Sequence, residues 1–86
     1  MNKKLVVKNE FEKTVYCVLS DEKPYKEQLM TVLSLNAGCG YTVAYKDDKL
    51  LVKDYRTNET VGTFHIISFT DTQEDVVLNW QSYNHS

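Results

Sequence analysis

The feature that most constrains the fold is an alternation of apolar and polar residues through three neighbouring segments in the second half of the chain. Residues 41–46, 49–56 and 60–69 alternate with a period of two, which is the side-chain period of a β-strand. The connections at 47–48 and 57–59 are short and contain Asp and Asn, which are typical turn residues. The three segments therefore predict a meander of antiparallel strands.

The two turns also predict how these strands pair. A shift by one residue would move every apolar side chain to the opposite face, so pairings that keep apolar residues together identify the register. The first turn predicts Tyr45 opposite Leu50 and Val43 opposite Val52, and the second predicts Val52 opposite Phe64 and Leu50 opposite Ile66. The predicted core face consists of Tyr41, Val43, Tyr45, Leu50, Val52, Phe64 and Ile66.

The first half of the chain predicts a hairpin followed by a helix. Residues 4–9 and 14–20 are rich in strand-forming residues and flank a polar loop. Acidic residues and Pro24 then mark a helix start. Apolar residues recur at spacings of three and four up to Gly38, a residue type that often follows a helix end. We therefore expect a helix over residues 22–37.

The C-terminal segment allows two interpretations. Asp71 and Glu74 have the spacing of a capping box, and Val76, Val77 and Trp80 then fall on one helical stripe. We favour a second helix here, although the apolar run that starts at Val76 also fits a final strand. Because Trp80 shares the apolar stripe, we expect it in the core rather than in a contact surface.

The expected architecture is a small α+β domain that spans residues 1–86 in the order ββαβββα. It has a mainly antiparallel sheet, one helix packed across the apolar face of that sheet, and a C-terminal helix. This order resembles a β-grasp arrangement, and its αβββα portion resembles a double-stranded-RNA-binding domain. Element order does not fix function, and no sequence motif identifies a family.

The composition is that of a globular intracellular protein. The chain has 86 residues, of which 42% are hydrophobic, which suffices for one small core. The apolar run after Lys4 is too short for a signal peptide, and no stretch approaches the roughly 18 apolar residues of a membrane helix. Together with two widely separated cysteines, this predicts a cytoplasmic protein with reduced thiols. The excess of lysine over arginine indicates an AT-rich genome, such as that of a low-GC bacterium or its phage.

No group of residues in the sequence predicts catalysis. Cys39 lies between two glycines, and His65 is a candidate base, which together are the pair that a small thiol enzyme needs. Cys39 follows the predicted helix, however, and the C-terminal end of a helix dipole disfavours a thiolate. The cysteines and histidines lack the spacing of a zinc site, and no phosphate-binding glycine motif occurs. We therefore expect no enzymatic activity, no metal and no cofactor.

The second face of the predicted meander is the best candidate for a functional surface, because it combines lysines with aromatic and aliphatic residues. The net charge of −2 argues against strong attraction to nucleic acid, so contact with a protein is the favoured interpretation. We expect a non-catalytic module that binds and regulates or inhibits a protein partner, without membrane contact. The alternatives are weak nucleic-acid binding by this face and, for self-association, pairing of two copies through a sheet edge. The candidate partner-binding residues are Lys46, Lys49, Leu51, Lys53, Tyr55 and His65.

Overall fold

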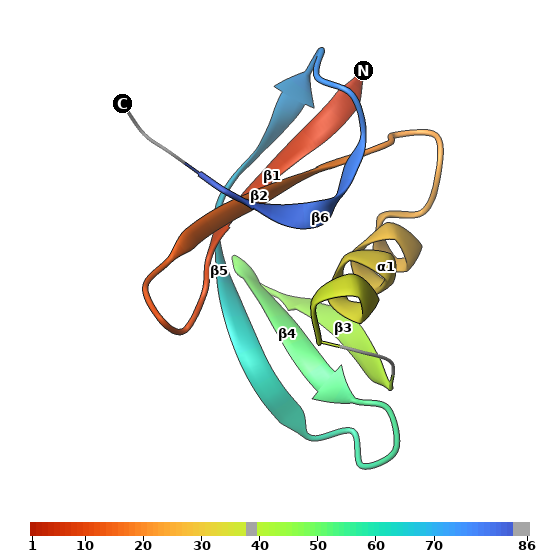
Figure 1. Cartoon of the computed structure of the whole chain (residues 1–86). Coiled ribbons are helices and arrows are strands. Elements are labelled where there is room, and N and C mark those ends of the chain that lie inside the picture. The colour runs from red at the N-terminus through yellow and green to blue at the C-terminus, as the bar shows by residue number, and fades with distance from the viewer. Residues whose placement is uncertain (38–39, 84–86) are drawn as a thin grey trace.

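The computed structural model describes residues 1–37 and 40–83, which form one helix and one sheet of six strands (Figure 1). Every strand pair is antiparallel, and the spatial order of the strands is β3-β4-β5-β1-β2-β6. The small α+β class predicted from the sequence is therefore confirmed. The elements are β1 (Asn2–Lys8), β2 (Thr14–Leu19), α1 (Tyr25–Ala37), β3 (Tyr41–Lys46), β4 (Lys49–Asp54), β5 (Thr60–Thr72) and β6 (Val77–Ser82).

The sheet is strongly curved, and α1 fills its concave side (Figure 1). Strand β5 runs through the whole height of the sheet and has one unpaired extra residue at Val61 and another at Ile67. Such bulges bend a strand and increase its twist. The rings of Phe64 in β5 and Trp80 in β6 lie 5.3 Å apart between centroids, although β1 and β2 separate these strands within the sheet. The curvature thus brings distant strands together across the interior.

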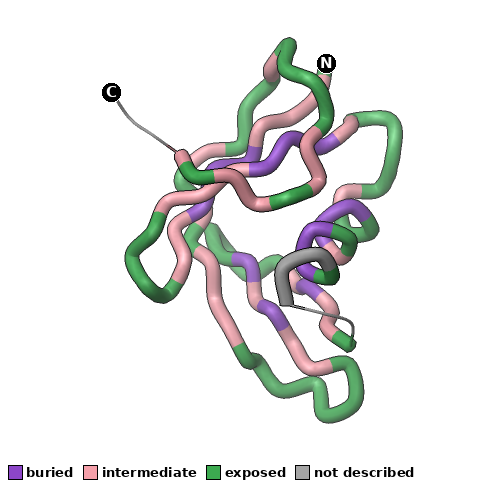
Figure 2. Tube along the Cα trace, in the orientation of Figure 1, coloured by how far each residue is buried: buried purple, intermediate pink, exposed green. Residues whose placement is uncertain are grey.

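The core lies between α1 and the concave face, where the buried residues gather (Figure 2). Val43, Leu50 and Val52 are buried there, as the alternation predicts. Tyr45, predicted on the same face, lies near the end of its strand and remains 51% exposed. The buried members of the core are Leu5, Val7, Cys17, Leu19, Leu29, Val32, Leu33, Val43, Leu50 and Val52.

The helix prediction is confirmed, but the helix begins at Tyr25 instead of residue 22. The residues before it form a loop that side chains stabilise. The Glu22 backbone N–H donates to the Ser20 hydroxyl, and the amide of the buried Gln28 bonds to the backbone at Ser20 and Lys23. These local bonds compete with helix formation, as is typical of serine near a helix start.

The register across the first turn of the meander is confirmed, and the register across the second is wrong by two residues. Tyr45 pairs with Leu50 as predicted, but Leu50 pairs with Phe64 instead of Ile66. The cause is that β4 ends at Asp54. Its carboxylate accepts hydrogen bonds from two backbone N–H groups of the following turn, which makes the connection longer than three residues. Because the shift is even, Leu50, Val52, Phe64 and Ile66 stay on the predicted core face.

The predicted C-terminal helix is wrong, because the structure has a strand at Val77–Ser82. The Thr72 hydroxyl accepts a hydrogen bond from the Glu74 N–H and donates one to its carboxylate, so the supposed capping box forms a turn. Leu78 and Trp80 alternate along the strand and pack against the core, while the strand pairs with the otherwise open edge of β2. The strand also removes the αβββα order on which the RNA-binding resemblance rested.

The opposite face of the sheet holds a second group of apolar residues, which the sequence pattern did not predict. Val6 and Val18 alternate with core residues and are nevertheless buried. The rings of Tyr16 and Tyr83 contact each other edge-on, and the Lys4 ammonium lies 4.5 Å from the Tyr16 centroid. The structure therefore buries apolar residues on both faces of β1 and β2. Among the described residues, no helix has the length and apolarity of a membrane span.

Candidate interaction surface

The convex face of β3, β4 and β5 holds most of the residues predicted to bind a partner. Strand pairing places Lys46 opposite Lys49, and Lys49 opposite His65. All three are exposed. The next strand extends this row, because His65 also pairs with Lys8 of β1. Neighbouring strands are about 4.8 Å apart, so these four side chains form a row roughly 14 Å long. We call Lys8, His65, Lys49 and Lys46 the basic row.

An uncharged strip lies beside the basic row. Ala44, Leu51 and Thr63 are paired across the same three strands, one step further along each strand pair. Leu51 and Ala44 are half-buried, and Lys53 lies beyond them opposite Thr42. The structure thus brings together five of the six predicted residues on one face, namely Lys46, Lys49, Leu51, Lys53 and His65.

Tyr55 is separated from this face. It follows the end of β4, at the opposite end of that strand from Lys49, and it is 75% exposed. Its backbone N–H donates to the Gly40 carbonyl at 2.8 Å. Tyr55 lines an open pocket of about 520 Å³ together with Gly40, Tyr41, Asp54 and Arg56. The strand predicted over residues 49–56 is too long, because β4 ends at Asp54, and the prediction that Tyr55 lies beside the lysines is therefore wrong.

The basic row is partly neutralised at one end. Lys8 forms an ion pair with Glu12, and the hydrogen bond from Lys8 is the main cause of a lowered pKa of the Glu12 carboxyl. Within residues 1–37 and 40–83, no ion pair involves Lys46, Lys49 or His65. The Lys46 and Lys49 ammonium groups are therefore available to an acidic ligand, although Asp47 and Asp48 in the adjacent turn weaken the local field.

The structure describes Cys17 but not Cys39. Cys39, the candidate nucleophile of the thiol-enzyme alternative, lies outside the described residues. Cys17 is fully buried in the core, and burial raises the pKa of its thiol to about 12. A thiol in this setting is an inert core residue. In the described part of the chain, no three His, Cys, Asp or Glu side chains gather as a metal site would need.

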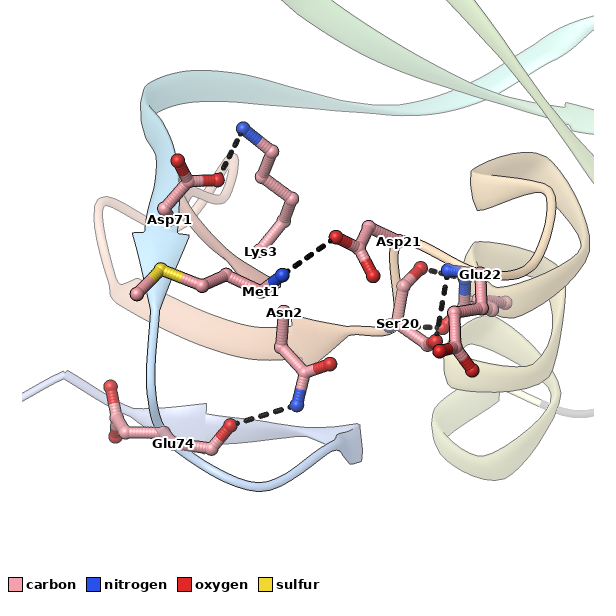
Figure 3. A network of polar contacts seen from close by, with 9 residues as sticks. Met1, Asn2, Lys3, Ser20, Asp21, Glu22, Asp71 and Glu74 are labelled. Carbon is pink, nitrogen blue, oxygen red and sulfur yellow. Dashed lines mark hydrogen bonds and ion pairs between the residues drawn. The ribbon is translucent and has the colours of Figure 1, made fainter.

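Ion pairs connect the start of β1 to neighbouring segments (Figure 3). The sequence pattern did not predict this network. It joins β1 to the loop before α1 and to the end of β5, and the Asn2 side-chain amide also donates to the Glu74 carbonyl. The Met1 amino group lowers the pKa of the Asp21 carboxyl, chiefly by hydrogen bonding to it. The ion pairs are Met1 with Asp21 at 2.9 Å, Lys3 with Asp71 at 2.7 Å and Lys4 with Glu74 at 2.9 Å.

Comparisons of this chain with protein-family models, with curated proteins and with solved structures found no match.

Proposed function

We propose that the protein is a non-catalytic module that binds and thereby regulates or inhibits a protein partner through the convex face of β3, β4 and β5. The observation that supports this proposal is the arrangement of Lys46, Lys49 and His65 in one row without ion-pair partners among the described residues, next to half-buried Leu51. An apolar centre with a polar rim is typical of protein interfaces.

The unpaired cations indicate the chemistry of the partner. An acidic segment that lies across the strands would meet the Lys46 and Lys49 ammonium groups and the exposed His65 in succession. Charge complementarity of this kind mainly increases the association rate and the specificity. Leu51 and Ala44 would supply the contact area from which water is excluded.

Affinity capture with matched surface variants tests this proposal. The double variant Lys49→Glu, Leu51→Glu changes the proposed face, whereas Lys26→Glu changes an exposed position on α1, on the other side of the sheet. We expect the wild-type protein and Lys26→Glu to retain the same partner and the double variant to lose it, with similar unfolding midpoints for all three. Retention of that partner by a folded double variant would refute the proposed face.

The basic row also supports a second candidate, binding to a single-stranded nucleic acid. The row adds Lys8 to the predicted lysines, but the separation of Tyr55 removes the stacking residue that this alternative needs. Phosphate contacts weaken steeply with salt, with a log–log slope near −0.7 per contact on single strands. We expect no measurable binding to an oligonucleotide at about 0.15 M salt. Binding at that salt concentration that Lys46→Glu and Lys49→Glu abolish would favour this candidate over the first.

A further inference from the structure

A second site lies inside the curve of the sheet, away from the convex face. A pocket of about 240 Å³ opens between the β1–β2 hairpin, α1 and the first half of β5. Buried Leu33 and Val52 form its floor, and exposed Glu10 and Val61 form its rim. Half-buried Tyr41, Gly62 and Phe64 complete the lining.

The pocket exists because β5 has glycine where a core-facing side chain would otherwise stand. Gly62 pairs with Val52, on the concave side of the sheet. A Cβ atom added there would meet only the Val52 Cβ, at 3.8 Å, which is ordinary contact. Its backbone does not take the positive φ that requires glycine, and the unpaired residue of the neighbouring bulge is Val61. Since glycine weakens a strand, its presence often marks a place that another group approaches closely.

The size and the lining define what the pocket can hold. A cavity of about 150 Å³ takes a benzene molecule, and pockets for drug-sized ligands begin near 300 Å³. A volume of about 240 Å³ therefore fits one aromatic ring with a short tail. Glu10 is the only charged residue of the lining, and in the described part of the chain it forms no ion pair. A tail with an ammonium group would match this carboxylate.

We propose that this pocket binds a small organic cation consisting of an aromatic or compact aliphatic group with a short ammonium tail. The apolar group lies against Phe64, Leu33 and Val52, in the space that the absent side chain of Gly62 leaves. The ammonium group lies at the rim beside Glu10. The site is independent of the convex face and of the partner proposed for it.

The single tryptophan of the chain provides the measurement. Trp80 lies 5.3 Å from Phe64 between ring centroids, so its fluorescence responds to a change at the pocket wall. The probes are 2-phenylethylamine, neutral 2-phenylethanol and anionic phenylacetate, each titrated at neutral pH. We expect saturable binding of the amine, about two- to fivefold tighter than that of the alcohol, because an exposed carboxylate contributes a modest attraction. Phenylacetate should bind most weakly.

Three variants separate this site from nonspecific binding. Gly62→Leu fills the pocket and should reduce amine affinity at least tenfold, while Gly62→Ala should reduce it less and serves as the second variant if Gly62→Leu does not fold. Glu10→Gln should abolish the preference for the amine and leave binding of the alcohol unchanged. The proposal is overturned by the absence of saturable amine binding, by wild-type affinity in folded Gly62 variants, or by tighter binding of phenylacetate than of the amine.

Discussion

Gln28 is the buried polar side chain of the described core, with 4% of its surface exposed. Its Oε1 accepts a hydrogen bond from the Ser20 backbone N–H at 2.7 Å, and its Nε2 donates to the carbonyls of Ser20 at 2.8 Å and Lys23 at 3.1 Å. One amide thus satisfies three backbone groups in the loop between β2 and α1. We predict that Gln28→Ala is among the most destabilising single changes in this helix.

The magnitude follows from the number of bonds lost. A hydrogen bond contributes about 0.5–1.5 kcal/mol net, so three bonds give an upper range of roughly 1.5–4.5 kcal/mol. Water can reach the partly buried loop, and alanine gains a few tenths of a kcal/mol in helix propensity. We therefore expect a loss of about 2–3 kcal/mol, which is large beside the ~4–13 kcal/mol typical of a chain of this length.

Urea unfolding, followed by circular dichroism, measures this loss as a lower midpoint with an unchanged slope. A decrease in unfolding free energy below about 0.5 kcal/mol would refute the reasoning, because substitutions at exposed positions have effects of that size. The Gln28→Glu variant is the matched control, since its carboxyl group has the same shape but cannot donate when ionised. Burial beside two carbonyl oxygens should raise its pKa in the folded state above the unfolded value. Its stability should therefore be greatest below about pH 4 and fall as the pH rises through the folded pKa, relative to wild type.

Three further predictions test the core, the buried thiol and a charged turn. Val52→Ala should cost about 1–3 kcal/mol because Val52 is buried, whereas Lys53→Ala on the convex face should cost within roughly 0.5 kcal/mol; a reversed order in urea unfolding would contradict the observed register. In a Cys39→Ser background, Cys17 should react with a thiol reagent at pH 8 only as fast as the protein unfolds, and rapid labelling of the folded protein would contradict its burial. The pKa of Asp54 is lowered by two backbone hydrogen bonds, so its contribution to stability should be present above about pH 4 and disappear as the pH falls through the lower folded pKa. Asp54→Asn, which does not titrate, should therefore show a smaller loss of unfolding midpoint between about pH 5 and 2, and an equal loss would exclude this effect.

The sequence predicts best where one local interaction determines the structure. Asp47 takes a positive φ of 58°, as the first central residue of a two-residue hairpin turn requires, and the register that follows it is correct. The second turn depends on the Asp54 carboxylate bonding to the backbone beyond it, and counting loop residues could not show that. Asp54 near the strand end, with Thr57 and Asn58 shortly after it, was a weak signal of such a turn.

The C-terminal strand depends on a contact that is distant in sequence. Val77–Ser82 is a strand because β2 leaves an edge open and because Trp80 reaches Phe64 across the curved sheet. The local pattern fits a helix and a strand equally well, and a short apolar run cannot decide between them. Tertiary pairing therefore selects the structure of this segment.

Part of the candidate surface could be predicted from neighbouring strands, and part depends on strands that are distant in sequence. The alternation in β3 and β4 was enough to place Lys46 and Lys49 on one face, since a single turn joins these strands. Lys8 joined the row only through the pairing of β1 with β5, whose partners His65 and Lys8 are 57 positions apart. The same pairing sets the bulge at Ile67, which leaves an apolar side chain 55% exposed on β5. A binding surface built across strands distant in sequence is thus assembled by the topology, and its residues are recognised as neighbours only once the strand order is known.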